Sequence, residues 1–197
     1  AEKEFRFPLD YGSQRPLSAS WTVTGSGAFA LGLNQKCRAH ITGMTPGRIV
    51  DYGLKDSMNM GACMAPAAAD TVARHMEDFH VTPEEYDRII TGDLGSVGQT
   101  VLIDLLREKG IDIADRHMDC GIEIFDAEAQ DTHAGGSGCG CSAVTLAAYI
   151  LPKLESGEWK KVLFLPTGAL LSKTSFNEGK SVPGIAHAVV LESPAVK

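Results

Sequence analysis

The sequence of 197 residues lacks several features that would place it in a specialised class of protein. No apolar run approaches the 18 residues that a membrane-spanning helix needs, and the first residues, AEKE, show no signal-peptide pattern. Lys and Arg total 18 against 25 Asp and Glu, so the net charge of −7 gives no reason to expect nucleic acid as a partner. These absences predict a soluble or peripheral chain that contacts proteins rather than lipids.

Disulfides are also not expected. Five cysteines are an odd number, and a chain of this length does not need disulfide bonds to be stable. The count therefore favours free thiols in a reducing compartment. The 44% hydrophobic and 22% charged residues exclude a disordered tail or a fibre. Glycine, in contrast, is abundant, with 21 residues. Because glycine permits tight strand-to-helix turns, this composition predicts a layered α/β protein.

Apolar spacing predicts alternating strands and helices. Pro66 is expected in the first turn of the first helix, and Pro152 is expected to kink the last one. Thr82 is read as the start of a capping box, Ser96 as a helix cap, and 168–180 as a polar loop. Strands are predicted at 22–33, 37–44, 88–93, 122–125, 161–166 and 184–191, helices at 65–79, 97–109 and 142–154, and a long loop at 45–60.

The run GGSGCGCS at 135–142 is the densest cluster of small residues. Backbone N–H groups at a helix start bind phosphate, so the run suggests a nucleotide site. However, the G-x-G-x-x-G pattern requires glycine at 141, where Cys141 stands, and the chain has no Walker-type lysine. We therefore interpret the glycines as allowing a helix start to pack closely against a neighbour or an anionic ligand.

Cysteines offer two further patterns. Cys139 and Cys141 have the spacing of a metal clamp, which Cys120 and His117 would complete as a zinc site. Residues i and i+2 of a helix point about 200° apart, so these thiols converge only in an extended segment, and small buried cysteines are the preferred interpretation. The stretch GACM at 61–64 resembles a nucleophile elbow, but the preceding residues read as loop instead of strand.

Histidines and one aspartate are placed by position alone. His75 and His80 flank a helix end and are expected to be solvated or to interact with the helix dipole. His117 falls in a predicted loop, and His187 falls in an apolar strand, where a hydrogen-bonded core histidine is the commoner case. Asp93 follows a strand and precedes a helix, where α/β sheets present ligand-binding groups.

Several motifs together resemble one family along nearly the whole chain. They are VTGSGA, PGRIVDYGLKDSxxMG, MAPAAADT, TGDL, DCG, AGGSGCGCSAV, TGALLS and IAHAVV. In these motifs the chain resembles the C-terminal half of the stage V sporulation protein AD family. The resemblance implies a thiolase-like fold of two pseudo-repeated halves. Residues 1–36 would be the tail of the N-terminal half, and 37–197 the C-terminal half, a layered α/β/α sheet with inner and outer helices.

The same resemblance implies a role in moving dipicolinic acid into the developing spore, at the inner membrane of the forespore and beside other stage V sporulation membrane proteins. Condensing enzymes of this fold have a Cys nucleophile in the N-terminal half, a His where TGDL stands at 91–94, and an Asn where GSGC stands at 136–139. This chain has none of the three. Without an imidazole the site is poorly equipped for acyl transfer.

We therefore expect a non-catalytic binder of dipicolinate, alone or as its calcium chelate, with no cofactor and no metal site of its own. No catalytic residue is assigned. The alternative is a condensing or thiolytic enzyme with unfamiliar catalytic residues, in which Cys120, Cys139 or Cys141 would need a depressed thiol pKa. The candidate ligand-binding residues are Asp93, His117, Cys120, Gly136, Ser137, Gly138, Cys139 and His187.

Assembly is the last expectation. The small-residue helix at 142–154 is the candidate inner helix, since Ala143, Ala147 and Ala148 permit close approach. An isolated half would leave the apolar face of this helix exposed. We therefore expect the chain to pair with the N-terminal half or with a second copy of itself.

Overall fold

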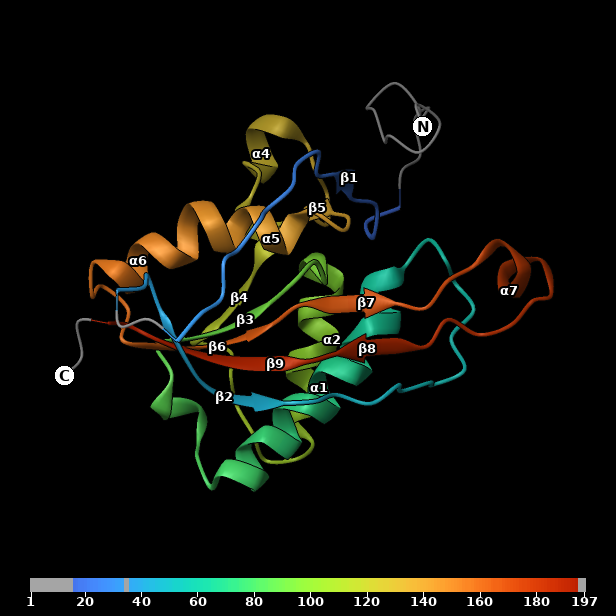
Figure 1. Cartoon of the computed structure of the whole chain (residues 1–197). Helices are drawn as coiled ribbons and strands as arrows, with labels where there is room; N and C mark the ends of the chain where they lie inside the picture. Colours follow the sequence, from blue (N-terminus) through green and yellow to red (C-terminus); the bar gives the residue numbers. More distant parts are fainter. Residues whose placement is uncertain (1–15, 34–35, 195–197) are drawn as a thin grey trace.

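A mixed β-sheet of five strands forms the centre of the molecule. The computed structural model describes residues 16–33 and 36–194 (Figure 1). Three neighbouring strands are parallel, and β9 is antiparallel to the strand on each side of it. In spatial order the strands are β2 (His40–Thr45), β9 (Ala188–Glu192), β6 (Lys161–Leu165), β3 (Arg88–Thr91) and β4 (His117–Asp119).

Helices cover both faces of this sheet (Figure 1). On one face lie α1 (Met60–Phe79) and α2 (Gly95–Arg107), packed against each other. On the other face α5 (Cys141–Thr145), the π-helical turn η4 (Leu146–Ile150) and α6 (Leu151–Glu155) follow one another as one rod. The predicted layered α/β architecture is therefore confirmed.

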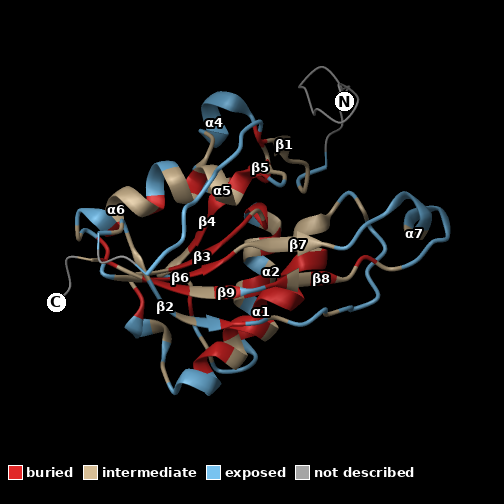
Figure 2. Ribbon diagram, viewed as in Figure 1, coloured by how far each residue is buried: buried red, intermediate tan, exposed pale blue. Residues whose placement is uncertain are grey.

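Two apolar clusters, one on each face of the sheet, form the core (Figure 2). On the α1 face, the small side chains of Ala65 and Ala68 pack in the same cluster as Leu163 of the sheet. On the α6 face, Ile150 and Leu154 pack in the second cluster. A strand covered on both faces must be apolar on both sides, which explains the uninterrupted VLFL run of β6.

Two glycines determine how α1 and α2 approach each other. A Cβ atom at Gly61 would lie 2.2 Å from the carbonyl oxygen of Leu94, and one at Gly98 would lie 2.9 Å from the backbone of Gly61. Side chains at these positions would therefore push the helices apart. The contact lies near the first turn of both helices, so both begin at the same edge of the sheet.

The strand predicted at 22–33 is wrong. Trp21 and Thr22 alone form β1 (Trp21–Thr22), which pairs with β5 (Gly136–Ser137). Residues 23–33, here called the strap, pass over the start of α5 without strand pairing. Glycines allow the strap to approach so closely, because a Cβ atom at Gly140 would lie 2.2 Å from the oxygen of Gly25. Apolar composition alone does not distinguish such a segment from a strand.

Helix starts also differ from the sequence predictions. α1 begins at Met60, five residues early, so Pro66 lies inside the helix, and Asn59 accepts from the backbone N–H of Ala62 as the cap. The Thr82 side chain makes no capping hydrogen bond to the 3₁₀ turn η3 (Pro83–Glu85). Ser96 lies within α2, whose first N–H groups are bound by a distant carboxylate described below.

Three corrections concern the second half of the chain. The short strand is β4, and the predicted strand at 122–125 overlaps α3 (Cys120–Glu123) instead. The predicted polar loop at 168–180 contains part of a hairpin, and the predicted last strand is divided at His187. Pro152 directly follows a π-helical turn, an irregularity of the kind found at helix kinks. The remaining elements are α4 (Ala127–Gln130), β7 (Thr167–Ala169), α7 (Lys173–Asn177) and β8 (Gly184–Ala186).

Among residues 16–33 and 36–194, no helix combines the length and the apolar character required to cross a bilayer.

Candidate functional site

The carboxyl ends of β3, β6 and β4 meet at one edge of the sheet because these strands are parallel. α2 and α3 begin shortly after β3 and β4, and the Sγ atom of Cys141, the first residue of α5, lies 3.6 Å from the carbonyl oxygen of Gly92. This edge is where open α/β sheets bind their ligands. The candidate site consists of residues 91–95, 119–122 and 136–141 together with Thr167.

Asp93 lies in the turn after β3 and reaches two other segments of the chain. Its Oδ2 atom accepts hydrogen bonds from Ser137 Oγ at 3.1 Å and from the N–H of Gly138 at 2.9 Å. Its Oδ1 atom accepts one from Thr167 Oγ1 at 3.2 Å. The structure thus brings together three predicted residues, Asp93, Ser137 and Gly138, and adds Thr167.

Burial changes the charge preference of this cluster. It raises the pKa of the Asp93 carboxyl above its usual value, and the neighbouring Asp119 carboxylate adds to the rise. Hydrogen bonds from Gly138, Ser137 and Thr167 act in the opposite direction. The Asp93 carboxyl therefore accepts a proton or a nearby cation more readily than an exposed aspartate does.

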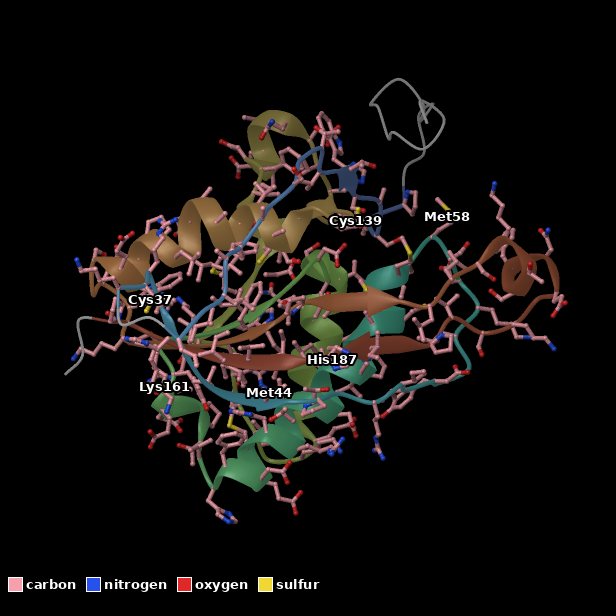
Figure 3. The ribbon with its side chains drawn as sticks, in the orientation of Figure 1. Cys37, Met44, Met58, Cys139, Lys161 and His187 are labelled. Atoms are coloured by element: carbon pink, nitrogen blue, oxygen red, sulfur yellow. The ribbon has the colours of Figure 1, made fainter. Side chains whose placement is uncertain are left out.

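The turn between β5 and α5, residues 138–140, is here called the donor turn because it supplies further hydrogen-bond donors. Within the described residues, no acceptor binds the backbone N–H groups of Cys139 and Gly140. Cys139 is exposed in this turn (Figure 3). Gly136 has a packing role, because a Cβ atom there would lie 2.7 Å from the Ile124 side chain. Hydroxyls, backbone N–H groups and the carboxyls of Asp93 and Asp119 are therefore the chemical groups of the site.

Asp119, at the end of β4, organises the backbone around the site. Its Oδ2 atom accepts from the N–H of Leu94 at 2.9 Å, and its Oδ1 atom accepts from the N–H of Gly95 at 3.1 Å. Oδ1 also accepts from Gly121 and Ile122, the first turn of α3. One carboxylate thus binds the starts of two helices. Burial raises the pKa of Asp119, whereas these bonds lower it.

His117 lies in β4 and not in a loop as was predicted. It is two residues before Asp119, where the strand ends at the sheet edge. Its Nε2 atom lies 3.0 Å from Thr91 Oγ1, and its Nδ1 atom lies 2.8 Å from Gln99 Nε2. Burial lowers the pKa of His117 to about 4. His117 is therefore a neutral residue that faces α2, behind the Asp93 cluster.

The cysteines do not form a zinc site. Within residues 16–33 and 36–194, no group of three or more His, Cys, Asp or Glu side chains is arranged to hold a metal ion. Cys120 and Cys141 are buried, as expected for small core cysteines, but Cys139 is exposed, so that expectation is wrong for Cys139. Burial raises the thiol pKa of Cys120, and it raises that of Cys141 to about 12.

Two histidines differ from the positions expected for them. His187 is exposed between β8 and β9, where its Nδ1 atom accepts from the N–H of Gly47 at 3.0 Å (Figure 3). The interpretation of His187 as a core residue is wrong, because the strand is interrupted there. No hydrogen bond among the described residues links it to Asp93.

His75 was expected to be solvated, but it is fully buried. It lies 2.7 Å from Thr45 Oγ1 and 2.6 Å from the Tyr86 hydroxyl. Burial, followed by the charge of Lys161, lowers the pKa of His75 to about 4. His75 lies on the side of α1 that faces Thr45 of β2 and Tyr86, so it is buried although it is near the end of the helix.

Sequence reasoning did not include Asp119 or Thr167 among the site residues. A usable signal existed for both, since each directly ends or follows a strand at the same sheet edge as Asp93. Gln99 carried no such signal, because its contact with His117 depends on how α2 packs on β4.

Comparisons with known proteins identify similar chains. A family model described as Stage V sporulation protein AD matches residues 1–192. The Stage V sporulation protein AD of Bacillus subtilis (strain 168) is 44% identical over 192 residues, which is 98% of this chain and 56% of the relative. The chain therefore spans little more than half the length of that relative.

Solved structures give weaker likenesses. An acetyl-CoA acetyltransferase from Syntrophomonas wolfei is 14% identical, with a TM-score of 0.48 over 80% of this chain and 32% of the enzyme. A 3-oxoacyl-[acyl-carrier-protein] synthase III from Aquifex aeolicus VF5 is 14% identical, with a TM-score of 0.41 over 80% of this chain and 46% of the enzyme. On the family match and the 44% identity to the Bacillus protein, the chain belongs to the Stage V sporulation protein AD family.

Proposed function

We propose that this chain acts in sporulation as the C-terminal half, residues 37–197, of a non-catalytic protein that binds dipicolinate during its uptake into the spore. Family membership supports the role in sporulation. The observation that carries the binding role is the convergence of Asp93, Ser137, Gly138 and Thr167 at the sheet edge. A planar pyridine with two carboxylates requires N–H and hydroxyl donors, and this edge offers both.

The buried Asp93 carboxyl constrains how such a ligand binds. Two carboxylates of the ligand beside an ionised Asp93 would repel it, and burial would strengthen the repulsion. The repulsion disappears when Asp93 holds a proton or when Ca²⁺ accompanies the ligand. Since burial raises the pKa of Asp93, both routes are compatible with the site. Binding should therefore be tighter with calcium or at lower pH than for free dipicolinate at high pH.

Cysteine chemistry supports a binding role over acyl transfer. A nucleophilic thiol needs a lowered pKa, but burial raises the pKa of the Cys120 and Cys141 thiols beside the site. Cys139 is exposed in the donor turn. Among Cys120, Cys139 and Cys141, only Cys139 is therefore placed to act as a nucleophile, and it is the residue to follow in any test for acyl transfer by this chain.

The remaining roles extend the same proposal. Residues 1–36 would belong to the N-terminal half, and that half or a second copy would complete the site. The partners would be other stage V sporulation proteins at the inner membrane of the forespore.

Isothermal titration calorimetry of the complete protein, which contains both halves, with dipicolinate in the presence and absence of Ca²⁺ tests the proposal. Heat of binding is expected with dipicolinate, and Ca²⁺ should increase binding of dipicolinate more than that of isophthalate, which has both carboxylates but lacks the ring nitrogen that helps to chelate the ion. Ser137→Ala should weaken binding, whereas Ser175→Ala in the exposed α7 is the matched control. An absence of heat at millimolar dipicolinate under both conditions would contradict the binding role, and formation of an acyl-enzyme on Cys139 would support the alternative.

A further inference from the structure

The Asp119 carboxylate determines the direction of a hydrogen-bond chain that ends at His117. Four backbone N–H groups, those of Leu94, Gly95, Gly121 and Ile122, point at this carboxylate, and an N–H group can only donate. Such a set of donors favours the ionised carboxylate. The fifth contact, Thr91 Oγ1 at 2.6 Å from Oδ2, is then a bond that the hydroxyl of Thr91 donates.

The Thr91 hydroxyl thus donates its single proton, and this sets the direction of its bond with His117. A hydroxyl has one proton, so Thr91 Oγ1 must accept at its 3.0 Å contact with His117 Nε2. The ring of His117 therefore carries its proton on Nε2. Because a neutral imidazole has only one N–H, Nδ1 is the acceptor for Gln99 Nε2 at 2.8 Å. Each bond runs in one direction, from Gln99 through His117 and Thr91 to Asp119.

These four residues surround the turn that carries Asp93. Thr91 precedes Asp93, and Leu94 and Gly95 follow it, and all three donate to Asp119. The turn is therefore held on both sides of Asp93. Its position determines whether the Asp93 carboxyl reaches Ser137 and Gly138 on the other side of the site.

We infer that His117 and Gln99 are positioning residues for the Asp93 site, acting through Thr91 and Asp119. This inference rests on the proposed function for its ligand. His117 acts from behind the site and does not touch the ligand. The reversed chain would require a proton on Asp119, a proton on Nδ1 of His117 and an amide of Gln99 turned to accept. The tautomer of His117 therefore reports the direction of its bond with Thr91 Oγ1, whose proton goes to Asp119 Oδ2 or, at 3.4 Å, to the carbonyl oxygen of Met118. A merely space-filling histidine would not have this signature.

Ring ¹⁵N NMR of His117 tests the direction without any ligand. The expected result at neutral pH is a protonated Nε2 and an unprotonated Nδ1. Gln99→Glu places an obligate acceptor at Nδ1, so the ring should gain a second proton and the pKa of His117 should rise. A neutral ring with its proton on Nδ1 in the unmodified chain would overturn the inference, as would an unchanged His117 in Gln99→Glu.

Calorimetry with dipicolinate and Ca²⁺ tests the link to the site. Thr91→Val removes the hydroxyl and should weaken binding about tenfold, because small shifts of a binding group are costly. Thr91→Ser retains the hydroxyl and should restore binding to within about twofold. Thr100→Val in α2, whose hydroxyl bonds only its own helix, is the matched control. Equal binding by Thr91→Val and the unmodified chain would refute the positioning role.

Failure of the proposed function and failure of the positioning role give different results. If the unmodified complete protein gives no heat with dipicolinate, the proposed function fails, and the NMR result still decides the direction of the hydrogen bonds. If the unmodified chain binds but the His117 tautomer is reversed, the proposed function survives and the positioning role falls. Should Thr91→Val not fold, Thr91→Ser and Gln99→Glu retain all donors of the turn and carry the test.

Discussion

Asp93 and Thr167 exchange two hydrogen bonds across the site. The backbone N–H of Asp93 donates to Thr167 Oγ1 at 3.2 Å, and this hydroxyl donates to Asp93 Oδ1 at 3.2 Å. The two residues are 74 positions apart in the chain. One side chain thus ties the turn after β3 to the β7–β8 hairpin, so the hairpin and the candidate site should respond together to changes at Thr167.

Thr167→Val should destabilise the protein by about 1–3 kcal/mol, because it leaves the N–H and a carboxylate oxygen of the half-buried Asp93 without this partner. Urea denaturation measures the loss. Thr174→Val in the exposed α7 is the control and should change stability by less than about 0.5 kcal/mol. Equal stability of the two variants would show that the exchange between Asp93 and Thr167 contributes nothing.

Stability should fall as pH falls from about 6.5 to about 4. His75 has its pKa lowered to about 4, so in this window the unfolded chain binds a proton that the folded chain does not. The free energy of unfolding therefore decreases with decreasing pH, by an amount on the order of 3 kcal/mol for this one group. Urea denaturation across this range should show a shallower slope for His75→Gln than for the unmodified chain.

The exposed His80 provides the control for that slope. In His80→Gln the free energy of unfolding should fall with decreasing pH as it does in the unmodified chain, because His75 still stays unprotonated in the folded protein over this range. An identical slope in His75→Gln and the unmodified chain would mean that burial does not hold His75 neutral in the folded protein.

Iodoacetamide at neutral pH should label Cys139 well before Cys120 and Cys141. Cys139 is exposed, whereas the other two are buried, and burial raises their thiol pKa, which lowers the thiolate fraction that reacts. Peptide mass spectrometry at several times measures the order. Labelling in strong denaturant should reach all five cysteines. Rapid labelling of Cys120 or Cys141 in the folded protein would favour the enzymatic alternative.

Replacing Met44 with Lys should reduce association of the chain and its binding of the dye ANS. Thr45 faces α1, where it bonds to His75, so its neighbour Met44 faces the opposite side of the sheet. There Met44 is 66% exposed and Ile41 is 54% exposed. These side chains lie on the same side of the sheet as the strap, where we propose that an N-terminal half or a second copy docks.

Sedimentation at micromolar concentration measures the association. Lys55→Glu in the exposed loop before α1 is the control, because it leaves the exposed side chains of Met44 and Ile41 unchanged. The candidate inner helix is already partly covered, since a Cβ atom at Gly27 of the strap would lie 3.0 Å from the Cβ atom of Ala143. A stable monomer near 21.0 kDa that binds no ANS would rule out the docking face.

The elements that sequence reasoning located are those whose signal is local. β3 and β6 have short continuous apolar runs, and α1 has apolar residues at helical spacing, so each was placed within a few residues. Asp93 was identified because a carboxylate between a strand and a helix has a defined place in an α/β sheet. The donor turn before α5 was found for the same reason, as glycines before a helix leave N–H groups accessible.

The features that were missed depend on contacts between distant segments. The strap reads as a strand until Gly25 meets Gly140 of the turn before α5, 115 positions later, and no local pattern encodes that contact. α2 appeared to be capped by Ser96, but Asp119 competes for the same role from another strand. His75 lies near the end of a helix in sequence, and only the packing of α1 on β2 shows that it is buried.

The position of β2 at the edge of the sheet has a consequence for the order in which the protein assembles. Among the described strands, β2 pairs with β9 alone, and their residues are 40–45 and 188–192. In contrast, β3, α2 and β4, with the carboxylate that binds their turn, lie within residues 88–119. Closing a longer loop costs more entropy. During synthesis the Asp93 turn can therefore form early, whereas the edge strand must wait until the ribosome has delivered residues 188–192.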